Sequence, residues 1–315
     1  MRTYCTIITV DYLPFTKVLV ASLKNSTEDV LLQVLVIDDN KTINSPGLSF
    51  HSINSLENTH FFKEIKNKYA HTDNPNHFRW ALKPIFINYL LENGFSKVLY
   101  IDPDQYFVND SSFLFDELDT NNILLTPHWP DINPIGNEDS LFAVLRGGLF
   151  NAGFIGSNIK GKAAMEWWAE MCHYKMERRK ELGLFDDQKY LDILPVQFPN
   201  VQIIKHQGCN LASWNIDACK REMINGELRI NKTYKPVFIH FSEDTIVNIL
   251  NQNDKLLQPF LDEYIAALKK ENIDLLNSVN HKDKKKDTSF YYAAKHKLRL
   301  RTRIKRFLFK LAEKI

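Results

Sequence analysis

Short, unbroken apolar runs separated by amphipathic segments are the feature that most constrains the fold of this chain. Three runs, Tyr4–Val10, Leu31–Ile37 and Lys97–Ile101, are rich in aliphatic and β-branched residues. Such runs are typical of strands buried on both faces, as in a parallel sheet covered by helices. Helical spacing follows the first run over Pro14–Leu23 and precedes the third over Ala81–Glu92. The alternation predicts an α/β fold with a mainly parallel sheet and flanking helices.

The remainder of the chain continues this pattern, with two irregular regions. Residues 40–60 are polar and turn-rich, and a proline-rich loop runs from Pro127 to Pro134. Gly94 is a helix stop signal. Further helices are expected at Phe61–Tyr69, Ala163–Leu182 and Leu256–Leu268 and at the start of FDDQKYLDIL (185–194), and further strands at Ile123–Thr126, Gly147–Ser157, Val201–Lys205 and Val237–Phe241.

The cysteines and the amino-terminal run indicate a cytoplasmic protein. The 315 residues include four cysteines, without a CxxC pair or a His/Cys cluster at zinc spacing. Reduced thiols are the plain interpretation, with a Cys209–Cys219 disulfide left as an alternative. The first apolar run meets Asp11 too early for a signal peptide or a membrane span.

The net charge of +2 hides an uneven distribution. Lys295–Ile315 holds nine Lys or Arg and one Glu, a charge of +8, so the first 294 residues carry −6. We therefore expect a catalytic domain at 1–275, a charged linker at 276–294 and a basic amphipathic helix at 295–315. Such a helix indicates binding to an anionic membrane surface, and docking on the protein's own body or on a partner is the alternative. Few aromatics interleave with the charges, so no nucleic acid is expected as a partner.

The strongest local signal is Asp102-Pro103-Asp104, directly after the third apolar run. Ligands of open parallel sheets bind beyond the carboxyl ends of the strands. Two carboxylates at such a position suit Mg²⁺ or Mn²⁺, which the oxygens of a diphosphate would also coordinate. The alternative is that Asp102 caps a turn or a helix.

The segment YIDPDQYF resembles the metal-binding motif of nucleotide-sugar glycosyltransferases with the GT-A fold. It is most similar to the retaining, glycogenin-like and galactosyltransferase-like group and its bacterial relatives, over about residues 4–243. The resemblance implies a Rossmann-like GT-A domain, a bound Mn²⁺ or Mg²⁺ and a nucleoside-diphosphate sugar, with uridine as the base. It places Thr9, Asp11 and Tyr12 near the base and ribose, together with Asp38 and Asp39.

Two further segments resemble donor-binding parts of these enzymes. RWALKPIFINYLL implies donor contacts from Arg79 and Lys83, although either could be an exposed helical charge. GGLFNAGFIG implies that Asn151 bonds a sugar hydroxyl and that Gly153 lets the backbone approach the donor closely. A structural glycine bulge is the alternative.

The segments that follow resemble the regions near the reacting carbon and the acceptor. Asp187 would hold sugar hydroxyls, and Gln188 would lie near the anomeric carbon, although this pair could also start a helix. Trp214 would stack on an acceptor sugar and Asn215 would bond its hydroxyl. Ordinary core and turn roles are the alternative for both.

His240 in VFIHFSE would be the third metal ligand beside Asp102 and Asp104, and a core histidine is the alternative. The chain departs from the family pattern after His240, where Glu243 and Asp244 replace the glycine or lysine that usually contacts the diphosphate. Possible substitutes for that contact are Lys205, Lys235 and Ser242.

These features predict a metal-dependent glycosyltransferase that transfers a sugar to a hydroxyl of a glycan or lipid-linked acceptor. We expect retention of anomeric configuration, in cell-surface polysaccharide synthesis at the inner face of the membrane. A catalytic base from Asp131, Glu138 or Asp139 would instead allow inversion. The alternatives are a sugar-nucleotidyltransferase, whose usual glycine-rich loop is absent from TVDYLPFTK, and a degenerate binding or scaffold protein.

Overall fold

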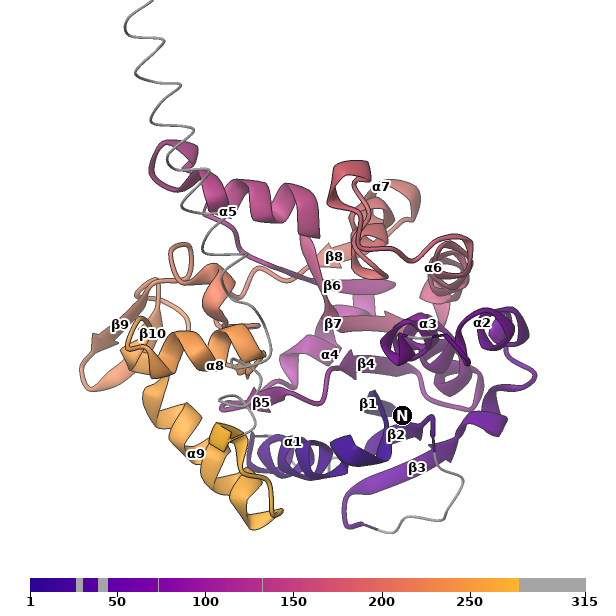
Figure 1. Ribbon diagram of the computed structural model, residues 1–315, viewed down its shortest axis with the longest axis horizontal. Coiled ribbons are helices and arrows are strands. Elements are labelled where there is room, and N and C mark those ends of the chain that lie inside the picture. Colours follow the sequence, from indigo (N-terminus) through magenta and orange to yellow (C-terminus); the bar gives the residue numbers. More distant parts are fainter. Residues whose placement is uncertain (27–30, 39–44, 73, 132, 278–315) are drawn as a thin grey trace, which may run out of the picture. The chain divides into compact units, whose positions relative to one another are not determined.

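A seven-stranded sheet lies at the centre of the structure, a computed structural model that describes residues 1–26, 31–38, 45–72, 74–131 and 133–277. Its strands, in spatial order, are β3 (Leu48–Ser52), β2 (Leu32–Val36), β1 (Arg2–Ile8), β4 (Lys97–Ile101), β7 (Phe150–Asn158), β6 (Ile123–Pro127) and β8 (Val201–Ile203) (Figure 1). Strand β7 is antiparallel to both of its neighbours, and all the other strand pairs are parallel. The predicted mainly parallel sheet is confirmed.

Helices α1 (Leu13–Ser26) and α4 (Phe113–Thr120) cover one face of this sheet, and α2 (Phe62–Tyr69), α3 (Pro75–Glu92) and α6 (Lys162–Tyr174) cover the other. The further helices of the described residues are α5 (Pro134–Gly147), α7 (Leu194–Gln197), α8 (Glu243–Leu250) and α9 (Gln258–Lys270). Alternate residues of β4 enter two separate cores: Val98 and Tyr100 pack with α2, α3 and α6, whereas Leu99 and Ile101 pack with α1 and α4. The alternation follows from the two-residue period of a strand. It explains why the buried strands are apolar at almost every position.

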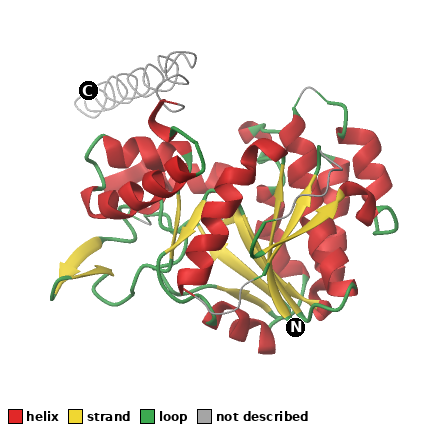
Figure 2. Ribbon diagram, turned by 90° about the horizontal axis from the view of Figure 1, so that it is seen from below, coloured by secondary structure: helices red, strands yellow, loops and turns green. Residues whose placement is uncertain are grey.

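Two small antiparallel sheets complete the fold. Strand β5 (Gln105–Phe107) pairs with β11 (Phe238–His240), and β9 (Arg221–Ile224) pairs with β10 (Glu227–Ile230). The second pair is a hairpin that projects from the body in Figure 2, and its turn residues Asn225 and Gly226 both have positive φ. Asn-Gly is the preferred pair for such a turn.

Four sequence expectations need correction. The helix predicted at Ala163–Leu182 ends at Tyr174, because Lys175 is extended and the following segment is held by contacts with residue 186 instead. Residues 48–52 form the edge strand β3, which escapes detection because it is only partly buried. The proline-rich loop is followed by a helix, α5, and the helix expected from FDDQKYLDIL is a 3₁₀ segment at Gln188–Ile193 before the short α7.

The residues Met1–Glu271 form one compact unit, and a second unit begins at Asn272. The predicted basic helix at 295–315 lies outside the described residues, as does the charged linker apart from residues 276 and 277. None of the described helices combines the length and the apolar character needed to cross a membrane. All four cysteines are buried and unpaired, as the reduced-thiol interpretation predicts.

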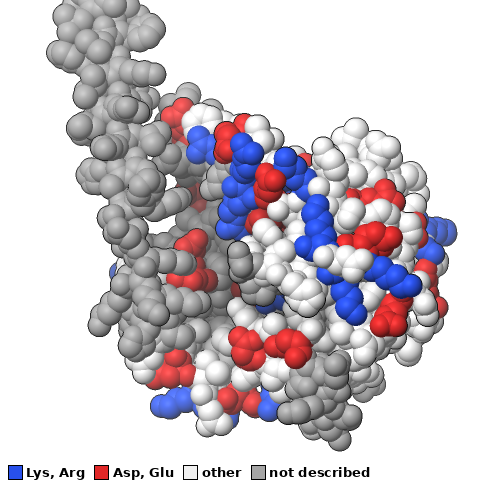
Figure 3. All heavy atoms as spheres, turned by 45° about the vertical axis from the view of Figure 1, so that its right-hand side comes forward, with Lys and Arg blue, Asp and Glu red and all other residues white. Residues whose placement is uncertain are grey.

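The surface of the described residues carries charges of both signs. On the face shown in Figure 3, basic and acidic side chains lie next to one another. Pairs such as Lys162–Glu92, with Nζ and Oε1 2.5 Å apart, join exposed side chains. Exposed pairs of this kind contribute about 1 kcal/mol or less each. Stability therefore depends mainly on the two apolar cores.

Candidate active site

The two aspartates of the DxD motif lie in the turn that joins β4 to β5. The backbone N–H of Asp102 donates to the carbonyl of Gly153 on β7, at 2.8 Å, so the turn begins against the neighbouring strand. The hydroxyl of Tyr100 donates to Oδ1 of Asp102 at 2.7 Å. One carboxylate oxygen of Asp102 is thus oriented by the sheet, and the other remains available to a ligand.

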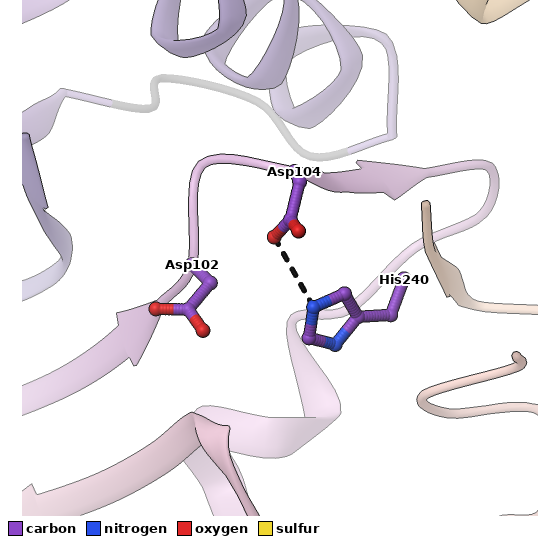
Figure 4. A group of neighbouring side chains, drawn as sticks. All are labelled: Asp102, Asp104 and His240. Atoms are coloured by element: carbon purple, nitrogen blue, oxygen red, sulfur yellow. Dashed lines mark ion pairs between the residues drawn. The ribbon is translucent and has the colours of Figure 1, made fainter. Parts of the chain in front are cut away.

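His240 reaches this turn because β11 pairs with β5. The pairing places His240 opposite Gln105, and the N–H of Phe241 donates to the carbonyl of Asp104 at 2.9 Å. The Nε2 atom of His240 lies 3.2 Å from Oδ1 of Asp104 (Figure 4). Burial opposes both charges, but their mutual attraction lowers the pKa of Asp104 and raises the pKa of His240.

Asp102, Asp104 and His240 together fit a divalent cation. Their ligand atoms all lie within 4.8 Å of one another. Nδ1 of His240 is buried and has no hydrogen-bond partner among the described residues, so it is available to a ligand. A Cβ atom at Gly153 would lie 2.8 Å from Oδ2 of Asp102 and 2.8 Å from Cε1 of His240, so glycine keeps this space open. Carboxylate and imidazole ligands suit several divalent metals, and a bound ion would polarise a diphosphate.

Lys83 of α3 supplies a buried positive charge beside this cluster. Its Nζ atom lies 3.3 Å from Oδ2 of Asp187 and 3.7 Å from Oδ1 of Asp102, and it donates to the carbonyl of Ala152 at 3.0 Å. Burial disfavours the ammonium, but the two carboxylates outweigh it and raise the pKa of Lys83. The alternative of an exposed helical charge is therefore wrong for Lys83, which is 2% exposed.

Asp187 and Gln188 line the same pocket as Asp102 and His240. Burial raises the pKa of Asp187 to about 6 despite the nearby ammonium of Lys83. The amide of Gln188 accepts from the N–H of Ala152 at 3.1 Å and donates to the carbonyl of Gly147 at 2.9 Å. Gln188 therefore links the end of α5 to the start of β7 and has a fixed orientation.

Asn151 is oriented by a histidine that the sequence did not single out. His128 Nδ1 contacts the carbonyl of Gly148 at 2.9 Å and therefore carries the proton there. Its Nε2 atom then accepts from Nδ2 of Asn151 at 3.2 Å. Oδ1 of Asn151 accepts from the N–H of Gly153 at 2.8 Å. Burial lowers the pKa of His128 to about 4, which keeps the ring neutral.

These side chains surround one pocket of about 160 Å³. The residues that line it are Trp80, Lys83, Asp102, Asn151, Ala152, Gly153, Arg178, Phe185, Asp186, Asp187, Gln188, Trp214 and His240. Eight predicted site residues line the pocket, and Asp104 adjoins them as the third member of the metal cluster. Trp80, Arg178, Phe185 and Asp186 were not predicted as site residues. Trp80, Phe185 and Asp186 lie in segments that resemble donor-binding parts, whereas Arg178 carried no signal in the sequence.

The predicted acceptor residues separate into two kinds. Trp214 lines the pocket, with its ring 5.3 Å from that of His240. Asn215 is fully buried: its Oδ1 accepts from Ala212 N–H and from Arg221, and its Nδ2 donates to the carbonyl of Asn210. The side chain of Asn215 therefore shapes the turn that carries Trp214 and has no free group for an acceptor.

The predicted base and ribose residues form a separate group at the ends of β1 and β2. Oγ1 of Thr9 donates to Asp11, and Oδ1 of Asp38 accepts from the N–H of Val10 at 2.9 Å. The guanidinium of Arg79 lies 5.1 Å from the ring centroid of Tyr12. None of Thr9, Asp11, Tyr12, Asp38 and Arg79 lines the pocket. Arg79 lies between Tyr12 and the DxD motif. Burial disfavours its charge, but nearby groups, including Asp102 and Asp104, raise its pKa.

The departure from the family pattern after His240 has a structural explanation. Ser242 is the N-cap of α8, and its Oγ accepts from the N–H of Thr245. Glu243 and Asp244 occupy the first turn, where negative charges are favourable near the helix amino terminus. Lys235, one suggested replacement for the diphosphate contact, lies 3.7 Å from Glu227 on the hairpin. The sequence at 242–244 thus builds a helix start.

Comparison with known proteins yields distant relatives. No family model matches the chain. Two uncharacterized proteins of Bacillus subtilis are each 28% identical: YfnF over 271 residues, covering 82% of this chain and 89% of YfnF, and YfnD over 240 residues, covering 73% of each.

Several solved structures are similar to parts of this chain. Mouse xyloside xylosyltransferase 1 is 12% identical and matches 78% of this chain and 99% of its own, with a TM-score of 0.47. The galactosyltransferase LgtC, solved with donor and acceptor sugar analogs, is 16% identical over 66% of this chain and 74% of its own, with a TM-score of 0.42. The glycosyltransferase GlyE of Streptococcus pneumoniae is 15% identical over 78% and 55%, with a TM-score of 0.46. All three are glycosyltransferases, but similarities at this level do not define the activity of this chain.

Proposed function

We propose that this protein is a metal-dependent glycosyltransferase that uses a nucleoside-diphosphate sugar, with UDP as the nucleotide. The observation that carries the proposal is one pocket whose lining includes two members of the candidate metal cluster, Asp102 and His240, together with polar side chains such as Asp187. Asp102, Asp104 and His240 would hold Mn²⁺ or Mg²⁺, which would stabilise the departing diphosphate. Asp187 and Asn151 line the same pocket and have polar groups suited to sugar hydroxyls.

The carboxylates around the pocket support retention of the anomeric configuration. Inversion needs a free carboxylate that acts as a base. Among the pocket residues, Asp102 belongs to the metal cluster, Asp186 is paired with Arg178, and Asp187 lies beside Lys83. Among the described side chains, Asp131 and Glu138, two of the alternative bases, do not line the pocket, and the side chain of Asp139 lies outside the described part of the structure. The anomeric configuration of the product, followed by NMR during turnover, tests this assignment.

Donor hydrolysis tests the proposed activity directly. The protein is incubated with Mn²⁺ and a panel of nucleotide sugars, and the release of nucleoside diphosphate is measured. Asp104→Ala should abolish release and metal-dependent UDP binding, because it removes one of three ligands. Asp262→Ala, at an exposed position of α9, is the matched control and should behave like the natural protein. Release that is unaffected by Asp104→Ala and by chelation would contradict the metal role.

Two further measurements, pyrophosphate formation and UDP binding, separate the alternatives. A sugar-nucleotidyltransferase would form pyrophosphate from a nucleoside triphosphate and a sugar phosphate, whereas the proposed enzyme would not. A degenerate binding protein would bind UDP with Mn²⁺ but release nothing from any donor sugar. Either result would replace the proposed activity.

We further propose a glycan or lipid-linked acceptor, used in cell-surface polysaccharide synthesis at the inner face of the cell membrane. The support is the sequence of the basic segment 295–315, which lies outside the described residues. Each basic residue near an anionic leaflet contributes on the order of 1 kcal/mol. Deletion of Lys295–Ile315 should abolish sedimentation with phosphatidylglycerol vesicles and leave donor hydrolysis unchanged. Equal sedimentation of the shortened protein would refute the membrane contact.

A further inference from the structure

The segment after α6 carries a charge pair that the proposed reaction does not use. Arg178 donates to Oδ2 of Asp186 through Nε at 2.8 Å and through Nη2 at 2.5 Å. The Asp186 side chain is only 5% exposed, whereas that of Arg178 is 55% exposed. Both donors meet the same carboxylate oxygen, and the opposite charges strengthen each bond, so Oδ2 of Asp186 is held at one place. The pair therefore holds Asp186 in one orientation.

The backbone at Asp186 also needs such support. Its φ is +49°, in the left-handed region that is unfavourable for most residues with a side chain. The N–H of Asp186 donates to the carbonyl of Glu177 at 3.1 Å, and Nε2 of His77 lies 3.8 Å from the other carboxylate oxygen. Asp186 is thus attached to the segment around residue 178 through both its backbone and its side chain.

Three consecutive residues at this edge of the pocket are held by three different parts of the molecule. The carbonyl of Asp187 accepts from Nε1 of Trp168 on α6 at 2.9 Å, and the carboxylate of Asp187 lies beside Lys83. Gln188 is held by β7 and by the end of α5. Asp186, the first of the three, depends on Arg178. Loss of Arg178 would remove the side-chain restraint on Asp186, directly before Asp187 and Gln188 in the pocket wall.

Arg178 also completes the pocket wall. Its guanidinium carbon lies 4.5 Å from the ring centroid of Phe185 and 5.9 Å from that of Trp80. All three residues line the pocket. Stacking of a guanidinium on aromatic faces is favourable and keeps it parallel to the wall.

Resting on the proposed function, we propose that Arg178 is a positioning residue for sugar transfer. By fixing Asp186, it sets the direction in which Asp187 and Gln188 enter the pocket. Its hydrogen-bond partner is Asp186, next to the proposed sugar-binding residues, and not a member of the metal cluster. Its removal should therefore slow the chemical step and leave metal-dependent nucleotide binding nearly unchanged.

The test compares neighbouring arginines. Arg178→Ala and Arg178→Lys are measured beside Arg179→Ala, whose side chain is 52% exposed and contacts Glu181 at the surface. We expect kcat for donor hydrolysis to fall by roughly tenfold to a hundredfold in both Arg178 variants, as for other misplaced active-site groups. Lysine should not rescue activity, because an ammonium group lacks the planar pair of N–H donors that Arg178 directs at Oδ2 of Asp186. UDP binding with Mn²⁺ should change less than about twofold, and Arg179→Ala should match the natural protein.

A second measurement keeps this inference separate from the proposed function. Hydrogen exchange of the amides of residues 186–188 should accelerate in Arg178→Ala whether or not any donor is hydrolysed, while exchange in β7 stays unchanged. Asp186→Asn, which tolerates the left-handed backbone but lacks the charge, should show the same acceleration. Unchanged exchange and unchanged kcat would overturn the positioning role, as would a uniform rise in exchange throughout the compact unit. Absence of nucleotide release from the natural protein would overturn the proposed function alone.

Discussion

The Nζ atom of Lys83 lies 3.3 Å from Oδ2 of Asp187, and neither side chain is more than 6% exposed. Asp102 lies 3.7 Å from the same ammonium group. The buried ammonium group of Lys83 therefore contacts both Asp102, a proposed metal ligand, and Asp187, a proposed sugar-binding residue. Removing one member of such a group leaves uncompensated charge away from water, and the cost is high.

Replacement of Lys83 by methionine should destabilise the protein by about 3–5 kcal/mol, because two carboxylates lose their counter-charge. Urea unfolding measures this loss. Lys17→Met, which breaks the half-buried pair with Glu271, is the control and should cost about 1 kcal/mol or less. Adding Asp187→Asn to Lys83→Met should restore part of the stability without restoring activity. A Lys83→Met protein as stable as the control would contradict the importance of this buried group.

Acid should destabilise the protein partly through His128. The folded-state pKa of about 4 lies below the usual 6.5. A depressed pKa gives stability that is complete above about pH 6.5 and is lost as the pH falls towards 4, at most about 3 kcal/mol for a shift of this size. Protonation also turns the acceptor for Asn151 into a donor. In His128→Gln, the difference in unfolding free energy between pH 7 and pH 4 should shrink, and an unchanged difference would exclude this contribution.

Two glycines of β7 should respond differently to the same change. A Cβ at Gly153 would lie 2.6 Å from Oδ1 of Asn151 and 2.8 Å from Oδ2 of Asp102. Gly153→Ala should therefore lose metal-dependent UDP binding by at least about tenfold, with a small change in melting temperature. A Cβ at Gly156 would lie 2.7 Å from Cδ2 of Leu99 in the core. Gly156→Ala should lower the melting temperature but retain nucleotide binding in the folded fraction, and the reverse result would argue against the cluster.

Trp214 should act on the acceptor and not on the donor. Its ring lines the pocket, and its Nε1 atom is buried with no hydrogen-bond partner among the described residues. Trp214→Ala should reduce transfer to a glycan acceptor by about tenfold or more, since buried aromatic contacts dominate many binding sites. Donor hydrolysis and UDP binding with Mn²⁺ should persist, and Trp214→Phe should recover part of the transfer. Equal losses of hydrolysis and transfer would assign Trp214 to the metal side instead.

The parts of the site predicted best from the sequence are those attached to buried strands. Lys97–Ile101 was predicted with its observed bounds, and the DxD motif follows it directly. The apolar run determines where the strand ends, and the motif places two carboxylates directly after that end. The meeting of Asp104 and His240 was inferred from resemblance only, because it depends on pairing two three-residue strands, β5 and β11, that are far apart in the chain.

The missed residues depend on contacts without a sequence period. Arg178 reaches Asp186 across a loop, so neither helical nor strand spacing reveals the pair. Asn215 shows the opposite error. Its neighbourhood resembles an acceptor segment, but hydrogen bonds inside the turn use its amide, and only the three-dimensional arrangement discloses this.

The reversed direction of β7 has a consequence for engineering a different sugar preference. Since β7 runs against its neighbours, its first residues border the pocket, whereas Phe154 and Ile155, one step further along, are fully buried in the two cores. Ala152 also belongs to one of the two cores, so variation confined to Asn151 would reshape the pocket at the entry to the strand without changing a core residue. A library at this one position would sample new donors from an otherwise intact scaffold.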